Sequence, residues 1–290
     1  AGVHLRASAW CAENGLVDEA IQHTLAAKDT PAAVELVVRH RYALMVAEQW
    51  RRLDRWLKLL PADAVAQSAL LSNARAFLAM QRGEEKVVLA SQRQAELLLA
   101  TIPIEAEEHK IAEAELAVLH AVRDYYAGQA TRATASARRG LELLPPQALH
   151  VRAMAMAVIV TSLQMGGDLE QGVRIMREAL ADPGWPAGLR TKLLHFLSEA
   201  YMMDGDLSGV LEAGSECLRI AEGLRLLESV SYGRYNMGTG HYLRNELDLA
   251  EPYLLALLDE RASSAPVYVA FGVFALALIY QAQGRGSEAT

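Results

Sequence analysis

The sequence predicts an all-α fold, a right-handed α-solenoid of about seven antiparallel helix pairs. Alanine and leucine, with glutamate and arginine, dominate the composition, and these residues are strong helix formers. Apolar residues recur at i, i+3, i+4 and i+7, the period of a helix with one buried face. A turn followed by a leucine-rich helix returns at a nearly constant spacing. No stretch alternates apolar and polar residues over more than a few positions, so we expect no sheet.

Turn residues mark the centre of each predicted pair. The first pair turns within ENGLVDEAIQHTL, residues 13–25, and the second lies between Pro31 and Leu60. The turn of this second pair falls near Glu48–Gln49, where glycine is absent. The later turns fall at Gly83, Gly128, Gly167, Gly205, Asn245 and Gly284. Separations of 45, 39, 38, 40 and 39 residues between these turns indicate an internal repeat.

Prolines delimit the helices, because proline has no N–H to continue a helix. LRTKLLHFLSEAYMM and LSGVLEAGSECLRIAEGL flank the turn at Gly205 and are predicted to form one antiparallel pair. The longest apolar run, from Pro266 to Tyr280, has about 15 residues and is shorter than the ~20 that cross a bilayer. We therefore expect a buried helix there. The prolines that close pairs are Pro61, Pro103, Pro145, Pro146, Pro183, Pro186 and Pro266.

The segment YNMGTGHYLRNELDLAEPYLLALL resembles a tetratricopeptide repeat, which has a Leu-Gly pair, a Gly-Asp turn and a small residue in its second helix. Met237 and Gly238 occupy the Leu-Gly positions, Asn245 the turn and Ala250 the small position. The resemblance implies that Gly238 lets the two helices of its pair approach closely. Gly240 has no counterpart in the repeat, so we expect either a ligand or a neighbouring helix to approach it. A period near 40 rather than 34 implies longer helices than in the standard repeat.

A narrower resemblance covers the start of the chain. LRASAWCAENGLVDEAIQHTLAAKD, residues 5–29, resembles the segment that follows the ATPase and winged-helix modules in MalT-like regulators, which are large ATP-binding transcription regulators of the LuxR type. RWLKLLPADAVAQSALLSNARAFLAMQRGE, residues 55–84, is similar to the next part of that architecture. The resemblance implies a single tetratricopeptide-like superhelical domain over residues 1–290, with opening repeats in 1–84 and repeats that form a groove in 85–290.

The same resemblance implies a sensor function. In MalT-like regulators this domain receives a small-molecule effector or a regulatory protein and controls ATP-dependent self-association, while a helix-turn-helix module binds DNA. The chain has no G-x-x-x-x-G-K-[ST] phosphate loop and no initial methionine, so we interpret it as a fragment without the ATPase and helix-turn-helix modules. The alternative is a free-standing tetratricopeptide scaffold that binds a peptide or helix of a partner protein.

Composition and motifs argue against several other functions. A net charge of −7 with scattered basic residues argues against direct binding of nucleic acid. Histidines never occur as H-x-x-x-H or H-x-H, and no catalytic serine or cysteine signature is present, so we expect no metal, no cofactor and no enzymatic activity. Cys11 and Cys217 lie far apart, and no signal peptide or membrane span is evident, which is typical of a cytoplasmic protein.

The concave surface offers the best candidate binding site. In a tetratricopeptide repeat the first helix of each pair lines that surface at about its second, fifth, ninth and twelfth positions. Gly238 and Ser198 each mark the eighth position of their copies. Tyrosines beside a lysine, a histidine and a glutamate suit a ligand with flat apolar faces and hydroxyls, although the tyrosines could instead simply pack between repeats. The candidate ligand-binding residues are Lys192, His195, Glu199, Tyr232, Tyr235, Thr239, Tyr242 and Tyr125.

Overall fold

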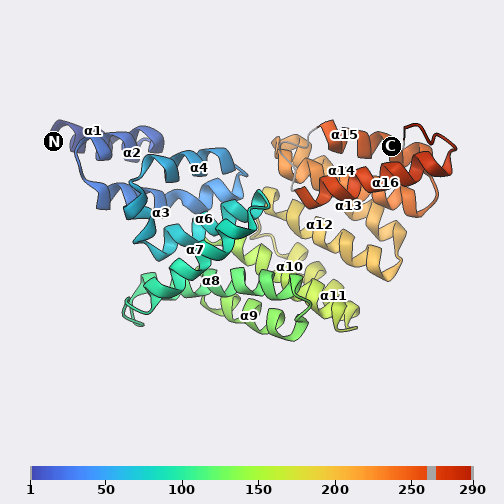
Figure 1. Ribbon diagram of the computed structural model, residues 1–290, viewed down its shortest axis with the longest axis horizontal. Helices are drawn as coiled ribbons and strands as arrows, with labels where there is room; N and C mark the ends of the chain where they lie inside the picture. The colour runs from blue at the N-terminus through green and yellow to red at the C-terminus, as the bar shows by residue number, and fades with distance from the viewer. Residues whose placement is uncertain (1, 260–265, 289–290) are drawn as a thin grey trace. The chain divides into compact units, whose positions relative to one another are not determined.

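The computed structural model describes residues 2–259 and 266–288, and within these ranges the chain forms helices and turns without any strand (Figure 1). The predicted all-α class is confirmed. The sixteen helices of the described residues are α1 (Gly2–Glu13), α2 (Val17–Ala26), α3 (Thr30–Val46), α4 (Trp50–Leu59), α5 (Ala62–Ala66), α6 (Ala69–Gln81), α7 (Glu85–Leu99), α8 (Glu107–Tyr126), α9 (Ala130–Leu143), α10 (Leu149–Met165), α11 (Leu169–Ala181), α12 (Ala187–Asp204), α13 (Leu207–Leu224), α14 (Leu227–Leu243), α15 (Leu247–Asp259) and α16 (Pro266–Ala282).

The predicted turns inside the pairs are confirmed by backbone geometry. Each has a residue in the left-handed conformation that ends a helix sharply, which glycine adopts without steric cost. In the second pair this residue is Glu48, with φ of 54°, so the turn predicted without a glycine lies where expected. The other left-handed turn residues within pairs are Gly15, Gly83, Gly128, Gly167, Gly205 and Asn245, and Gly284 follows α16.

Two turns between pairs have no glycine signal. Lys28 separates α2 from α3 with φ of 63°, and Arg225 separates α13 from α14 with φ of 56°. A side chain with a Cβ rarely adopts this conformation. Neither turn was predicted at its residue, because the sequence shows only an ordinary charged side chain there.

The Gly-Asp dipeptide both ends one helix and begins the next. Gly205 takes the left-handed conformation after α12, and Asp206 then accepts a hydrogen bond at 2.9 Å from the backbone N–H three residues on, at the start of α13. Gly167 and Asp168 do the same between α10 and α11, where the bond measures 3.3 Å. The carboxylate satisfies one of the orphan donors of the helix N-terminus, which explains why the repeat has aspartate after glycine.

Each helix packs mainly on its neighbours in the chain, as in a tetratricopeptide-like helical solenoid. Helix–helix contacts divide the chain into two units, one of residues 1–120 and 139–151 and the other of 121–138 and 152–290. The single domain over 1–290, with its division at residue 84, stays a prediction. None of the helices in the described ranges is long and apolar enough to cross a membrane.

In the first unit a buried polar network ties three helices together. Arg41 on α3 forms an ion pair with Glu115 on α8 at 2.7 Å, and both side chains are almost completely buried. The hydroxyl of Tyr42 and the amide of Asn73, on α6, donate hydrogen bonds to the same carboxylate. The charges are therefore compensated inside the core.

In the second unit glycines set the spacing between helices. A Cβ on Gly238 would lie 2.6 Å from Cδ2 of Leu254, on the second helix of the same pair, so its predicted role in close approach within the pair is confirmed. A Cβ on Gly240 would lie 2.8 Å from Cδ2 of Leu211 and 2.9 Å from Cγ1 of Val210, both on α13. Of the two explanations for Gly240, a neighbouring helix is the one that the structure supports.

Candidate functional site

A cluster of five side chains brings three first helices together in the second unit. We call it the His195 cluster: His195 and Glu199 from α12, Tyr232 and Tyr235 from α14, and Tyr268 from α16. The imidazole of His195 stacks on the Tyr232 ring, with centroids 4.3 Å apart and planes at 7°. Tyr268 meets the imidazole edge-on at 4.8 Å, and Tyr235 lies 5.0 Å from Tyr268. Helix α14 packs against both α12 and α16, so the three helices bring these side chains together (Figure 1).

His195 is fully buried and hydrogen-bonded at both ring nitrogens. Burial is the main cause that lowers its pKa, to about 3, so the imidazole is neutral at physiological pH. Nδ1 lies 3.2 Å from Oδ1 of Asn236, which can only accept. We therefore assign the ring proton to Nδ1, which leaves Nε2 to accept from the Tyr268 hydroxyl at 2.7 Å.

The lysine of the cluster region is already paired. Nζ of Lys192 lies 3.1 Å from Oε1 of Glu228, and both side chains are buried. The Tyr232 hydroxyl donates to the same carboxylate, and the ammonium lies 5.2 Å from the centroid of the Tyr232 ring. This pair therefore contributes no net charge to the surroundings of His195.

Glu199 is the titratable carboxyl at the solvent side of the cluster. Its side chain is 24% exposed, and Oε1 lies 3.6 Å from Nε2 of His195. Burial raises the pKa of Glu199 to about 7, while the hydrogen bond between its carboxyl and the Tyr268 hydroxyl acts in the opposite direction. Burial, and then the charge of Glu199, raise the pKa of Tyr235 to about 12 and also raise that of Tyr125. Tyr235 and Tyr125 are therefore neutral phenols near this carboxyl.

Most of the candidate residues lie in or beside the His195 cluster, but some are partly exposed and others are buried and paired. Tyr235 and Glu199 remain partly exposed, and Thr239 hydrogen-bonds to Tyr235 one turn away. Tyr125 on α8 hydrogen-bonds to Thr161 on α10 and lies within electrostatic reach of Glu199. The side chains that are instead buried and paired inside the cluster are Lys192, His195 and Tyr232.

Tyr242 lies apart from the cluster. It packs against a core formed by α15 and α16, which includes Leu254 and Leu276. This packing is what the alternative of packing between repeats predicts for Tyr242, although both Tyr242 and Tyr235 are partly exposed. A role for the candidate residues in ligand binding stays a prediction.

Sequence reasoning missed three members of this site. Tyr268 lies one turn before Phe271 on the same helix, and the aromatic pair at i and i+3 is the signal that could have revealed it. Glu228 stands four residues before Tyr232 on α14, the spacing that places two side chains on one face. Asn236 holds the imidazole of His195, and no local pattern indicates such a contact over 41 residues of sequence.

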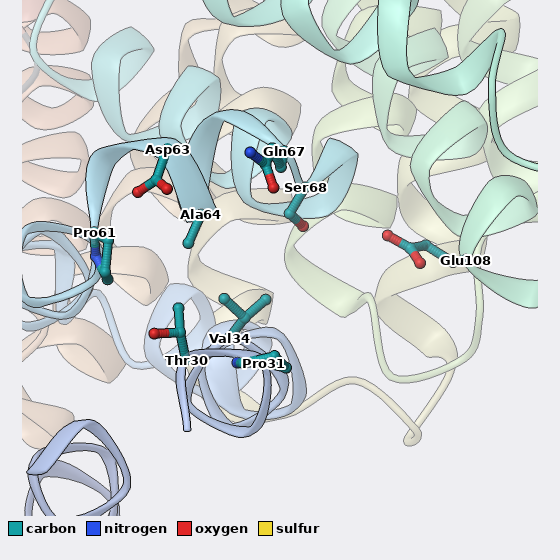
Figure 2. Close-up of a pocket in the computed structure, with 9 residues that line it drawn as sticks. All are labelled: Thr30, Pro31, Val34, Pro61, Asp63, Ala64, Gln67, Ser68 and Glu108. Carbon is teal, nitrogen blue, oxygen red and sulfur yellow. The ribbon is translucent and has the colours of Figure 1, made fainter. Parts of the chain in front are cut away.

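A pocket lies in the first unit, away from these residues in the sequence. It is an open pocket of about 470 Å³ between the start of α3 and the α5–α6 region (Figure 2). Its polar groups include Asp63, Gln67, Ser68 and Glu108, and Figure 2 shows Glu108 reaching it from α8. None of the candidate residues lines it. Within the described ranges no group of three or more His, Cys, Asp and Glu residues could hold a metal ion.

Comparison with known proteins identifies a family that this chain matches. The family model described as the MalT-like TPR region matches residues 114–290. The chain is similar to the serine/threonine-protein kinase PknK of Mycobacterium tuberculosis, with 33% identity over 152 residues that cover 51% of this chain and 14% of the kinase.

Two transcription regulators are also similar. The HTH-type transcriptional regulator MalT of Serratia proteamaculans is 26% identical over 177 residues, which cover 61% of this chain and 19% of that protein. MalT of Yersinia pestis is 28% identical over 175 residues, which cover 60% and 19%. The matched region thus spans less than a fifth of the length of each of these relatives.

Proposed function

Because this chain belongs to the family of MalT-like TPR regions, we propose that it is the sensor domain of an ATP-dependent transcription regulator of the LuxR type. The domain binds an effector on the face made by the first helices of its pairs. Binding controls self-association of the regulator in the cytoplasm. The helical repeat itself has no catalytic role, since a MalT-like TPR region is a repeat domain and not a catalytic fold.

One observation carries this proposal: alternate helices converge on a single cluster. Tyr125 on α8, Thr161 on α10, Glu199 on α12, Tyr235 on α14 and Tyr268 on α16 are linked by hydrogen bonds, ring contacts or charge. In a stack of helix pairs, the first helices of successive repeats share one face. A ligand held by residues of several repeats therefore contacts all of them at once.

Such a site couples binding to the stiffness of the stack. Each repeat contacts mainly its neighbours, so a stack resists bending only through the interfaces between consecutive pairs. A ligand that bridges α12, α14 and α16 adds contacts between repeats in the bound state alone. It shifts the population towards the arrangement that binds it best, by as much as its affinity for the two arrangements differs.

Two other assignments have some support. A free-standing scaffold would use the same face for a peptide or helix of a partner protein, and the exposed Phe271 and Phe274 on α16 favour an apolar partner. The similarity to PknK favours a regulatory region attached to a kinase instead of a transcription regulator. In both cases the domain is a binding module. The first alternative changes what it binds, and the second changes the domain to which it is attached.

The experiment that tests the proposal is a thermal-shift screen of small molecules with the purified chain. A ligand at a hundredfold excess over its Kd stabilises the folded state by about 2.7 kcal/mol, which gives a measurable rise in Tm. We expect Tyr235→Ala to abolish the shift. Tyr253→Ala is the matched control, because Tyr253 is also half-buried and stacks on a histidine, His241, outside the cluster.

Sedimentation velocity with and without the hit then tests self-association. Effector binding that leaves the sedimentation coefficient unchanged would argue against control of assembly by this chain. A hit whose Tm shift survives Tyr235→Ala but is lost in Tyr253→Ala would move the binding site away from the His195 cluster.

A further inference from the structure

The charges around the His195 cluster leave one carboxyl without a compensating cation. Lys192 is paired with Glu228, and His195 is neutral because burial lowers its pKa. Among the described residues, the ion-pair contact of Glu199 is with this neutral imidazole. A carboxylate at the partly buried edge of a cluster is costly unless a positive group or hydrogen-bond donors face it.

Aromatic rings lie near the same carboxyl. Tyr268 hydrogen-bonds to Glu199, and Tyr235 lies 5.0 Å from Tyr268 between ring centroids. Phe271 continues the row at 6.3 Å from Tyr235 and is 51% exposed, so the row reaches solvent. A cation is attracted to the faces of Tyr and Phe rings within about 6 Å of the centroid, and aromatic cages for ammonium ligands use this attraction.

We propose that the effector of this domain carries an ammonium group, which binds against the Glu199 carboxylate and the faces of Tyr235, Tyr268 and Phe271. The inference rests on the proposed function, since it names the chemical class of the ligand for that site. An anionic effector would meet the Glu199 carboxyl, and Lys192, the described cation beside the cluster, is already paired with Glu228. A neutral ligand would leave Glu199 protonated and make no use of its charge.

Binding of a cation changes the hydrogen bonds of the cluster. When Glu199 is protonated, its O–H donates to the Tyr268 hydroxyl, which in turn donates to Nε2 of His195. When the ammonium ion holds Glu199 in its ionised form, the single proton of Tyr268 turns to the carboxylate. Nε2 of His195 then loses its donor, so the contact between α12 and α16 changes with the ligand.

The test is isothermal titration of the purified chain with choline and with 3,3-dimethylbutan-1-ol, its neutral isostere in which carbon replaces nitrogen. Tyramine and its neutral analogue 4-ethylphenol form a second pair for a flat ligand. We expect each cation to bind at least about tenfold more tightly than its neutral partner. Titration at pH 6 in two buffers of different ionisation enthalpy is expected to show proton release from Glu199.

Three variants separate the contributions. Glu199→Gln keeps the shape of the protonated acid, and we expect it to lower the affinity for each cation about tenfold while it leaves the neutral partner unchanged. Tyr235→Phe keeps the ring and is expected to retain cation binding, whereas Tyr235→Leu loses it. Equal binding of the neutral isostere, an unchanged affinity in Glu199→Gln, or no binding of either cation would overturn the inference.

The outcome also distinguishes this inference from the proposed function. An effector without an ammonium group that binds in a Tyr235-dependent way would overturn the inference and leave the sensor function standing. The failure of every ligand, cationic or not, to bind in a Tyr235-dependent way would count against both.

Discussion

His195 and Tyr232 stack face to face across the interface between α12 and α14, with ring centroids 4.3 Å apart and planes tilted by only 7°. The two residues belong to consecutive repeats, and each holds a further contact with Tyr268 on α16. Three first helices are thus joined through one buried imidazole. The stack explains why the most polar part of the first helices is also well packed.

His195→Ala is expected to lower the free energy of unfolding by about 2–4 kcal/mol, since it leaves a cavity and removes the partners of Asn236 and Tyr268. Urea unfolding of the chain followed by circular dichroism measures this. Arg219→Ala, at an exposed helix position, is the control and is expected to leave the free energy of unfolding nearly unchanged. A loss for His195→Ala as small as that of the control would show that the stack contributes little to stability.

Stability at alkaline pH is expected to be limited by Glu199. The folded state raises the pKa of this carboxyl from its ordinary value to about 7, so the native protein binds the proton more tightly than the unfolded chain. The contribution of Glu199 to stability is present below the unfolded pKa and is lost as pH rises towards and through 7. The loss amounts to at most about 3 kcal/mol.

Glu199→Gln isolates this contribution, because His195 acts in the opposite direction. Burial lowers the pKa of His195, so its contribution is lost as pH falls below about 6.5, and the two slopes partly cancel in the parent chain. We expect Glu199→Gln to be more stable than the parent at pH 8 and similar to it at pH 5. Urea unfolding of both proteins at the two values tests this, and parallel stability curves would contradict the assignment.

The sequence predicts the fold more completely than it predicts the candidate site. Turns follow from local chemistry, so Gly205 with Asp206, and even Glu48, could be placed from the repeat period. The positions that lie on the face shared by the first helices depend on helix length, and α12 and α14 have 18 and 17 residues, longer than those of the standard repeat. Numbering by the standard repeat therefore did not place Tyr268 of α16 in the cluster.

The numbering of groove positions could not show which side chains a neighbouring repeat covers. Tyr242 has a groove position by count, yet α15 and α16 pack around it. His195 also has a groove position, but the stack with Tyr232 and the contact with Tyr268 bury it completely. Burial depends on packing between segments more than 30 residues apart, which a single sequence does not reveal.

Alanine substitutions of two glycines, one on α13 and one on α14, are expected to change the stability of the protein in opposite directions. A Cβ on Gly233 would lie 2.7–2.9 Å from Cβ, Cα and N of Leu218 on α13, so Gly233→Ala must displace backbone and is expected to cost about 1–3 kcal/mol. Gly223→Ala has nothing within 4 Å of the new Cβ and is expected to stabilise the helix by about 0.5–1 kcal/mol. Differential scanning calorimetry checks both. A gain in Tm for Gly233→Ala would disprove the close approach of α13 and α14.

Removing one partner of the buried pair of Arg41 and Glu115 is expected to lower the free energy of unfolding more than replacing both partners. Glu115→Gln or Arg41→Met leaves an uncompensated charge in the core of the first unit and is expected to cost about 3–5 kcal/mol in urea unfolding. The double variant Arg41→Met/Glu115→Leu removes both charges and is expected to lose less than either single variant. Its residual loss comes from the hydroxyl of Tyr42 and the amide of Asn73, which no longer have the carboxylate as acceptor.

The control for this pair is the ion pair of Glu35 and Arg39 on the same helix as Arg41. Both of its side chains are more than half exposed, so water screens the attraction and Glu35→Gln is expected to cost less than about 0.5 kcal/mol. If Glu115→Gln lowered the free energy of unfolding no more than Glu35→Gln, the guanidinium of Arg41 would have to be exposed to solvent in the variant. The network would then not be the closed polar core through which α3, α6 and α8 hold one another in the first unit.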